Sequence, residues 1–398
     1  MSTEWDQCAV HLKPPRELFK HIVVPQRTLM GPGPSNCSKR VLNSLKEPVL
    51  GHLHPEICKM MDEIKAGLQY AFQTKNRLTL ALSASGHGGM EASLGNLLEQ
   101  GETILIIKSG IWGERAADMA DRLGLKVHLL TTELGDGFTL GQLESALQLF
   151  LPKVVFITHS ESSTGLVQSL KGVGALVHRY NALLIVDTVA SLGAEPFFAD
   201  AWEVDVVYTG SQKCLGAPPG ITPISFSPLA EKKIRNRKTK VPVFYWDMTI
   251  LGNYWACFGN PRPYHHTISA TLVYGLREAL AQLAEETLPA SWVRHANATK
   301  KLHCGLKDRG FEFYVKNPEN RLKTVTAIKV PPGIDAKVAT TYAMERHNVE
   351  IAGGLGPTQG KIFRIGLMGV NATAYHVDLV LRVLDDSIKH AKTLSSNL

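Results

Sequence analysis

The chain has 398 residues, of which 44% are hydrophobic and 20% are charged. This composition supports a sizeable core and excludes a disordered chain, and the 34 glycines and 21 prolines without a fixed period exclude collagen-like classes. The net charge of +7 is compatible with binding nucleic acid or anionic metabolites. No apolar run approaches the ~18 residues of a membrane-spanning helix, so no membrane partner is expected.

The start of the chain predicts an irregular segment over residues 1–30, because several prolines interrupt it. Glu4 and Asp6 stand where a secretory signal would carry an apolar stretch, so the sequence does not predict secretion. Apolar residues then recur at helical spacing and predict an amphipathic helix over residues 55–73.

Short β-rich runs alternate with helical stretches in the middle of the chain. Because the strands are apolar on both faces, they predict a buried, doubly wound parallel sheet. A long helix is expected over Thr267–Glu285, and residues 290–398 then predict helix, strand, helix, strand and helix in a smaller α+β domain. The expected strands cover residues 103–107, 127–130, 154–158, 183–187 and 206–209, and the helices between them cover 112–123, 139–149 and 168–180.

Two glycine-rich segments invite a comparison with phosphate-binding loops. Gly31–Asn36 lacks the third glycine of a dinucleotide fingerprint and follows no strand, so it does not predict NAD binding. Ser85–Ala92 opens a helix, where free N–H groups favour an anion, although an ordinary glycine turn capped by Ser85 is the alternative. The histidine pairs lack metal-ligand spacing, so no metal is expected.

Asp187 and Lys213 carry the strongest chemical signal in the chain. Asp187 closes a buried strand at the sheet edge where open α/β folds bind ligands, and a buried acid there needs a donor or a charge. Lys213 follows the next strand, and this pair suits pyridoxal phosphate: the lysine forms the Schiff base and the aspartate holds the pyridine nitrogen protonated. Trp112, in a turn after another strand, can stack on a flat ring. Surface charge is the alternative for the first two residues, and core packing for the tryptophan.

Ten segments together carry a family resemblance: MGPGPSN, FQT, SASGHGGME, GIWGERA, ESSTGL, LLIVDTVASLG, YTGSQKCLGAPPGI, RPYHHTI, GGLGPT and FRIGLMG. With them the chain resembles the alanine–glyoxylate/serine–pyruvate aminotransferases, which are class V aminotransferases of the fold type I pyridoxal-phosphate enzymes. The resemblance implies a large domain over residues 31–288, with a mostly parallel sheet and helices on both faces. It also implies a small C-terminal α+β domain over 289–398 and an N-terminal extension, 1–30, that packs on a partner subunit.

The same resemblance implies roles for individual residues. Lys213 and Asp187 would be catalytic, and Arg364 would bind the substrate carboxylate as a bidentate fork. Tyr264 and Thr267 would reach the cofactor phosphate of the neighbouring subunit, so the resemblance implies a homodimer with active sites shared across the interface. The implied cofactor-binding residues are Ser85, Gly86, His87 and Gln212 at the phosphate, Trp112 and Asp187 at the ring, Ser162 near the ring substituents, Lys213, and the neighbouring subunit's Tyr264 and Thr267. The implied substrate-binding residues are Arg364, Ser162, Gly51, His52 and Leu53.

The implied reaction is ping-pong transamination, in which the amino group of alanine, or of serine, passes to glyoxylate to give glycine. Lys213 would act as general base and acid at the substrate α-carbon. Residues 51–54 and 244–247 look more like invertebrate members, some of which transaminate 3-hydroxykynurenine, so that activity is the alternative. A non-catalytic nucleic-acid-binding protein is the third hypothesis, and it rests only on the net charge and the basic run 232–240, whose other interpretation is a solvated surface loop.

The C-terminal tripeptide Ser396-Asn397-Leu398 resembles the S-K-L import address, with asparagine in place of the usual basic residue. It predicts a peroxisomal protein; a frayed tail is the alternative, and the location would then be cytoplasmic or mitochondrial. None of the six cysteines forms a C-x-x-C pair, which fits a reducing compartment.

Overall fold

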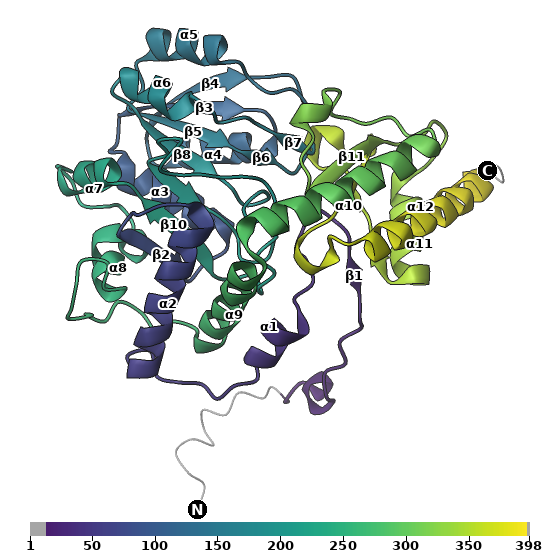
Figure 1. Ribbon diagram of the computed structural model, residues 1–398, viewed down its shortest axis with the longest axis horizontal. Helices are drawn as coiled ribbons and strands as arrows, with labels where there is room; N and C mark the ends of the chain where they lie inside the picture. The colour runs from purple at the N-terminus through teal and green to yellow at the C-terminus, as the bar shows by residue number, and fades with distance from the viewer. Residues whose placement is uncertain (1–12, 396–398) are drawn as a thin grey trace, which may run out of the picture.

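The computed structural model describes residues 13–395 (Figure 1). Most of their buried apolar side chains gather in two large hydrophobic cores. The larger core lies around a seven-stranded sheet, and the smaller one is formed mainly by the last hundred residues of the chain. Helix α10 (Leu288–Asp308) begins in the larger core and ends in the smaller one. This one helix therefore connects the two cores directly.

The large sheet is mostly parallel, as predicted, with one antiparallel strand. The exception is β10 (Thr222–Phe226), which returns beside β9 after a connection without a helix, whereas a parallel crossover usually contains one. The sequence analysis missed both β10 and its neighbour β2. In spatial order the strands are β2 (Leu78–Leu82), β10, β9 (Val206–Tyr208), β8 (Leu183–Asp187), β5 (Val154–Thr158), β3 (Thr103–Lys108) and β4 (Lys126–Thr131).

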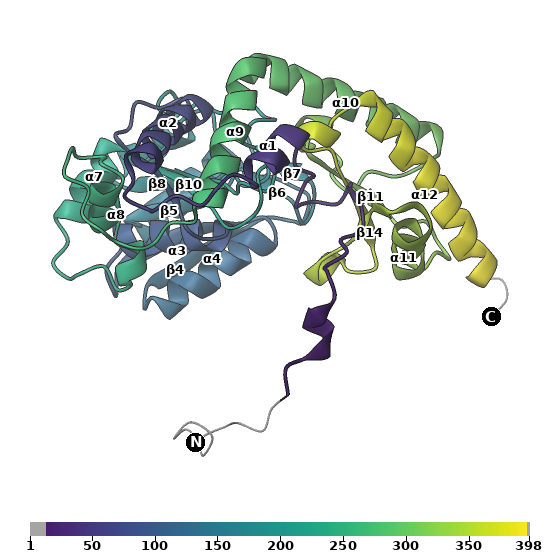
Figure 2. The same ribbon diagram turned by 90° about the horizontal axis from the view of Figure 1, so that it is seen from below.

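Helices cover both faces of this sheet. Figure 2 shows α2 (Pro55–Phe72) and α9 (Ala270–Glu286) on one face and α3 (Gly86–Leu97) and α4 (Ile111–Arg122) on the other. Helix α6 (Val173–Arg179) begins later than the predicted 168–180, since the residue before it, Gly172, has the left-handed φ of +78° and cannot continue a helix. The other elements of this part are β6 (Ser160–Glu161), β7 (Leu166–Val167), α5 (Leu140–Phe150), α7 (Pro228–Arg235) and α8 (Met248–Tyr254).

The second core follows the predicted order of helices and strands but recruits the start of the chain. Strand β1 (Thr28–Leu29) pairs with β12 (Val349–Glu350), and Met30 is fully buried in this core. Residues 28–30 therefore pack with the C-terminal part, and the predicted domain boundaries remain predictions. The other elements are β11 (Val325–Lys329), β14 (Ile362–Gly366) and β13 (Ala352–Gly353), with α11 (Ala336–His347) and α12 (Ala374–Ser395) packed together beside them.

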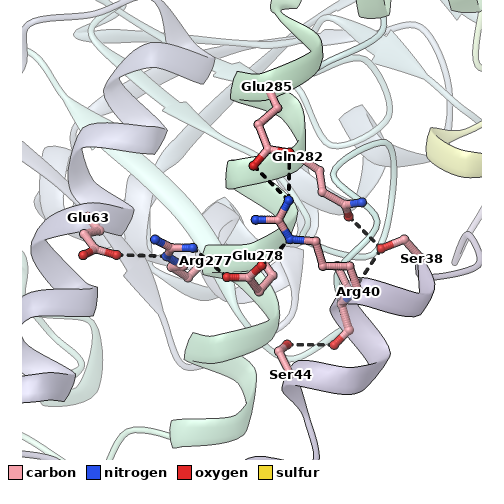
Figure 3. A network of polar contacts seen from close by, with 9 residues as sticks. Ser38, Arg40, Ser44, Glu63, Arg277, Glu278, Gln282 and Glu285 are labelled. Carbon is pink, nitrogen blue, oxygen red and sulfur yellow. Dashed lines mark hydrogen bonds and ion pairs between the residues drawn. The ribbon is translucent and has the colours of Figure 1, made fainter.

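Residues 30–38, the crossing segment, connect β1 to helix α1 (Lys39–Ser44) on the larger core. A network of polar contacts fixes α1 there (Figure 3). Ser38 donates to Gln282 at 2.6 Å, and Arg40 forms ion pairs with Glu278 and Glu285 of α9. Single surface pairs stabilise little, but a network of them fixes a helix end in place. The crossing segment is thus anchored at both ends.

Within residues 13–395, no helix is both long and apolar enough to cross a bilayer, and no three potential metal ligands of the His, Cys, Asp or Glu type gather in one place. The described cysteines are all free. In the basic run, Lys233 pairs with Glu102, and Arg237 donates to main-chain carbonyls of Asn96 and Leu98. The predicted import signal, residues 396–398, lies outside the described residues.

One half-buried histidine makes stability pH-dependent. His178 on α6 lies between Asp205 (2.8 Å) and Glu203 (3.0 Å), and the hydrogen bond to Asp205 is the main cause of its raised pKa. This stabilisation is complete below the unfolded pKa of about 6.5 and is lost as the pH rises through the folded pKa. We expect His178→Gln to lower the Tm more at about pH 5.5 than at about pH 9. A Tm difference that does not change with pH would assign the histidine a packing role only.

Candidate functional site

A cavity of about 360 Å³ lies where the crossing segment and both cores meet. Most of its wall comes from loops and helix starts that follow the strands of the large sheet, while Arg364 and Leu355 come from the C-terminal part of the chain. Nine predicted site residues line this cavity: Ser85, Gly86, His87, Trp112, Ser162, Asp187, Gln212, Lys213 and Arg364. The remaining wall consists of Pro32, Gly33, Met90, Ser160, Val189, Ala190 and Leu355.

Asp187 ends strand β8 and is 4% exposed. One carboxylate oxygen accepts the N–H of Val189 and the other accepts the hydroxyl of Tyr208, both at 2.8 Å. Burial raises the pKa of Asp187 to about 6, although both hydrogen bonds oppose this rise. The sequence analysis expected a donor for this acid without identifying Tyr208.

Lys213 lies in the loop after β9, beneath the crossing segment. Its Nζ donates to the carbonyl of Pro32, and its own carbonyl accepts the hydroxyl of Ser35 at 2.6 Å. Gly33 has φ +112°, and a Cβ there would overlap the lysine side chain, so glycine is required. Burial lowers the pKa of Lys213 to about 8. The glycine-rich segment Gly31–Asn36, which does not match a dinucleotide-binding loop, therefore covers this lysine.

Helix α3 begins at the cavity with open donors. Ser85 stands at the N-cap, but its side chain makes no capping bond, so the first N–H groups have no side-chain partner. Gly88 and Gly89 lie inside the helix, where a Cβ would come within 2.5 Å of Ala84 and 2.7 Å of Thr222. These two glycines thus serve close packing. Beside the helix, the buried Oε1 of Gln212 has no hydrogen-bond partner.

The turn Glu161–Ser163 holds the tryptophan of the cavity wall. The indole N–H of Trp112 donates to Ser162 Oγ at 2.9 Å, and its main-chain N–H donates to Glu161 at 3.1 Å. Glu161 is 1% exposed and also accepts two bonds from Ser163, and burial raises its pKa to about 7. Sequence reasoning missed Glu161, although an acid directly before Ser162 in an otherwise buried stretch was a signal.

Arg364 is a buried cation on β14, 7% exposed. It donates to the carbonyls of Gly353 (2.8 Å) and Ser162 (3.2 Å), and within the described residues it forms no salt bridge. Burial lowers its pKa, but a guanidinium stays charged in proteins. Its remaining N–H groups are suited to bind an anion in the cavity.

Five predicted residues do not line the cavity in this single chain: Tyr264, Thr267, Gly51, His52 and Leu53. Three of them gather elsewhere, since the His52 and Tyr264 rings lie 5.0 Å apart and Tyr264 Oη is 3.4 Å from Thr267 Oγ1. Tyr264 is 58% exposed. The predicted cofactor contacts of Tyr264 and Thr267 require a second chain, and the predicted roles of all five residues stay predictions.

Comparison with known proteins gives consistent matches over nearly the whole chain. The family model described as aminotransferase class V matches residues 32–380. An alanine–glyoxylate aminotransferase of Drosophila melanogaster is 50% identical over 96% of this chain and 98% of its own length, and one of Callithrix jacchus is 48% identical over 95% and 91%. The crystal structure of an alanine–glyoxylate aminotransferase from Nostoc sp. has a TM-score of 0.90 at 41% identity, covering 97% of this chain and all of that one. A ureidoglycine–glyoxylate aminotransferase from Bacillus subtilis has a TM-score of 0.91 at 32% identity, covering 94% and 95%.

The role of Glu161 can be tested by stability. Glu161→Ala leaves the buried N–H groups of Trp112 and Ser163 without an acceptor, and we expect a loss of about 1–3 kcal/mol in urea unfolding. Glu114→Ala on α4, the helix whose start Glu161 contacts, is the control, because among residues 13–395 this exposed side chain has only a 3.6 Å contact with Lys108. Equal losses in the two variants would show that Glu161 does not support the helix start.

Proposed function

The chain belongs to the class V aminotransferases, which depend on pyridoxal 5′-phosphate, and on that premise we propose that it is an alanine–glyoxylate aminotransferase. It transfers the amino group of alanine, and to a lesser extent of serine, to glyoxylate, giving glycine. The observation that carries this proposal is the convergence of three buried ionisable side chains, Lys213, Asp187 and Arg364, on one cavity.

The residues around the cavity fit this cofactor. The open N–H groups at the start of α3 border a place for an anionic phosphate, and Gln212 lines the cavity beside them. The Trp112 indole, fixed through Ser162, offers a flat apolar face, and Asp187 offers a carboxylate to a protonated ring nitrogen. We therefore assign these residues to cofactor binding, together with Ser85, Gly86 and His87.

When bound, the cofactor supplies an electron sink for the charge that develops at the substrate α-carbon. Lys213 would take the proton from the α-carbon of alanine in the first half-reaction and would supply a proton to the α-carbon derived from glyoxylate in the second. Its lowered pKa of about 8 gives it a useful neutral fraction near neutral pH. Arg364 orients the substrate by its carboxylate, because its free N–H groups face the cavity. Closure by the crossing segment keeps water away from Lys213.

We also propose a homodimer with shared active sites. Tyr264 and Thr267 lie outside the cavity and on the surface of this chain, where a partner could use them. Phe244 and Leu53, 64% and 44% exposed, add apolar area to the same part of the surface, and buried apolar area is what stabilises an obligate interface. The N-terminal extension would pack on the partner through exposed apolar side chains such as Phe19 and Ile22.

Mixed dimers test the shared site. Lys213→Ala removes the proton carrier and should abolish turnover, and a Tyr264→Ala, Thr267→Ala chain should lose most of it. Each mixed dimer would keep one intact site, so refolding the two variants together should restore about a quarter of the wild-type sites. Activity no higher than the sum of the separate variants would contradict shared sites.

Substrate choice separates the proposed function from the 3-hydroxykynurenine alternative. The side chains of Gly51 and Leu53 offer an aromatic donor neither a hydrogen bond nor a ring, and His52 is the residue of this segment that can contact one. With one such contact in place of several, we expect a higher kcat/KM for alanine than for 3-hydroxykynurenine, with glyoxylate as acceptor. Changing residues 51–53 to Ser-Asn-Phe supplies an asparagine that can hydrogen-bond and a ring that can stack on an aromatic substrate. This change should move the ratio of the two kcat/KM values toward the aromatic donor by about tenfold or more.

Val49→Phe is the control for this substitution, because it adds an exposed ring beside the segment without changing it. A wild-type enzyme that prefers 3-hydroxykynurenine would overturn the assignment of alanine as donor.

A further inference from the structure

Tyr208 is a fully buried tyrosine that touches the cavity only through another residue. It ends strand β9, and the register of the sheet places it directly beside Asp187 on β8. Its hydroxyl donates to Asp187 Oδ2 at 2.8 Å. Burial raises the pKa of Tyr208 well above its ordinary value, so its proton stays in place as a donor at any pH at which the protein works.

Packing and main-chain hydrogen bonds both restrain Tyr208. Helix α3 packs against the phenol ring, since a Cβ at Gly89 would be 3.0 Å from it. Thr188 fixes the main chain of Tyr208, because it donates to the Tyr208 carbonyl through both its main-chain N–H (3.0 Å) and its hydroxyl (2.9 Å). A ring fixed by packing and by main-chain hydrogen bonds directs its O–H to one place, and that place is the carboxylate of Asp187.

The charge of Asp187 needs such support. Of the groups that face it, Lys213 in the next loop favours the ionised form, whereas Glu161 on β6 is a second buried acid. The main-chain N–H of His159 donates to the main-chain carbonyl of Asp187. Burial lowers the pKa of the His159 imidazole to about 3, so this side chain carries no positive charge. His87 of α3 and Arg364 of β14 lie further round the same cavity. In the part of the chain that the structure describes, only the Val189 N–H and the Tyr208 hydroxyl donate directly to the carboxylate.

We propose that Tyr208 is a positioning residue that keeps Asp187 ionised and its carboxylate turned toward the cavity, and so fixes the protonated state of the cofactor ring nitrogen. The proposal rests on the proposed function for the identity of the cofactor, but not for the amino donor. Removing the hydroxyl leaves the buried carboxylate with one direct donor, and the neutral acid then becomes more stable. The cofactor's ring nitrogen would in that state lose its ionic partner.

The test compares Tyr208→Phe with Tyr274→Phe. Tyr274 is also a buried tyrosine, and its hydroxyl donates to the Pro48 carbonyl at 2.9 Å, away from the cavity. Pyridoxal 5′-phosphate affinity is measured across pH by equilibrium dialysis, and Tm is measured in parallel. Affinity should fall as the pH is lowered and Asp187 becomes protonated. Because Tyr208→Phe loses a hydrogen bond to a charged group, the midpoint of this fall should lie about one pH unit higher than in the wild type. In Tyr274→Phe the midpoint should not shift. The acid limb of kcat/KM should move in the same direction.

Profiles of affinity and rate that superimpose on the wild type, with only the Tm lowered, would overturn the proposal and leave Tyr208 a structural residue. If Tyr208→Phe does not fold, 3-fluorotyrosine at position 208 replaces it. Its more acidic phenol is a stronger donor, so the affinity profile should move to lower pH; an unchanged profile would equally overturn the proposal. Wild-type turnover of alanine with glyoxylate is a separate measurement, so a failure of the proposed donor does not obscure this result.

Discussion

Three buried charges without salt bridges are the constraint on which the rest of the structure depends. Lys213, Asp187 and Arg364 find their hydrogen bonds at main-chain groups and at one phenol. Neutral partners satisfy the hydrogen-bonding groups but leave the net charge in place, and an uncompensated buried charge is costly. Packing of the surrounding fold offsets the free energy of burying these charges. Each charge can still attract a ligand group of opposite sign in the cavity.

The sequence could predict the parts of this arrangement that depend on local pattern. Apolar runs of strand length define β3, β5 and β8, and an acid at the end of β8 marks the edge of the sheet that binds ligands. Tyr208 could not be predicted as the partner of Asp187, because the pairing depends on the register between β8 and β9. The same holds for Glu161, whose role appears only when the hairpin β6–β7 meets the start of α4.

Residues 51–53, Tyr264 and Thr267 illustrate a different limit. The family resemblance singles them out, but no contact within one chain brings them to the cavity. Their position on an exposed part of the surface is stable by itself, since Tyr254 donates to the His52 carbonyl and Tyr264 packs beside His52. What they do for a second copy is a property of the assembly, and neither periodicity nor burial in one chain expresses it.

The pairing of β1 with β12 has a consequence for biosynthesis. Thr28 and Leu29 leave the ribosome early, but their partners Val349 and Glu350 are among the last residues to emerge. At ~5–20 residues per second, β1 waits for tens of seconds with its edge unpaired. The Gly31–Gly33 cover over Lys213 cannot settle before then, because β1 anchors it. A nascent chain can therefore form its large sheet before its cavity closes, because closure waits for Val349 and Glu350 to emerge.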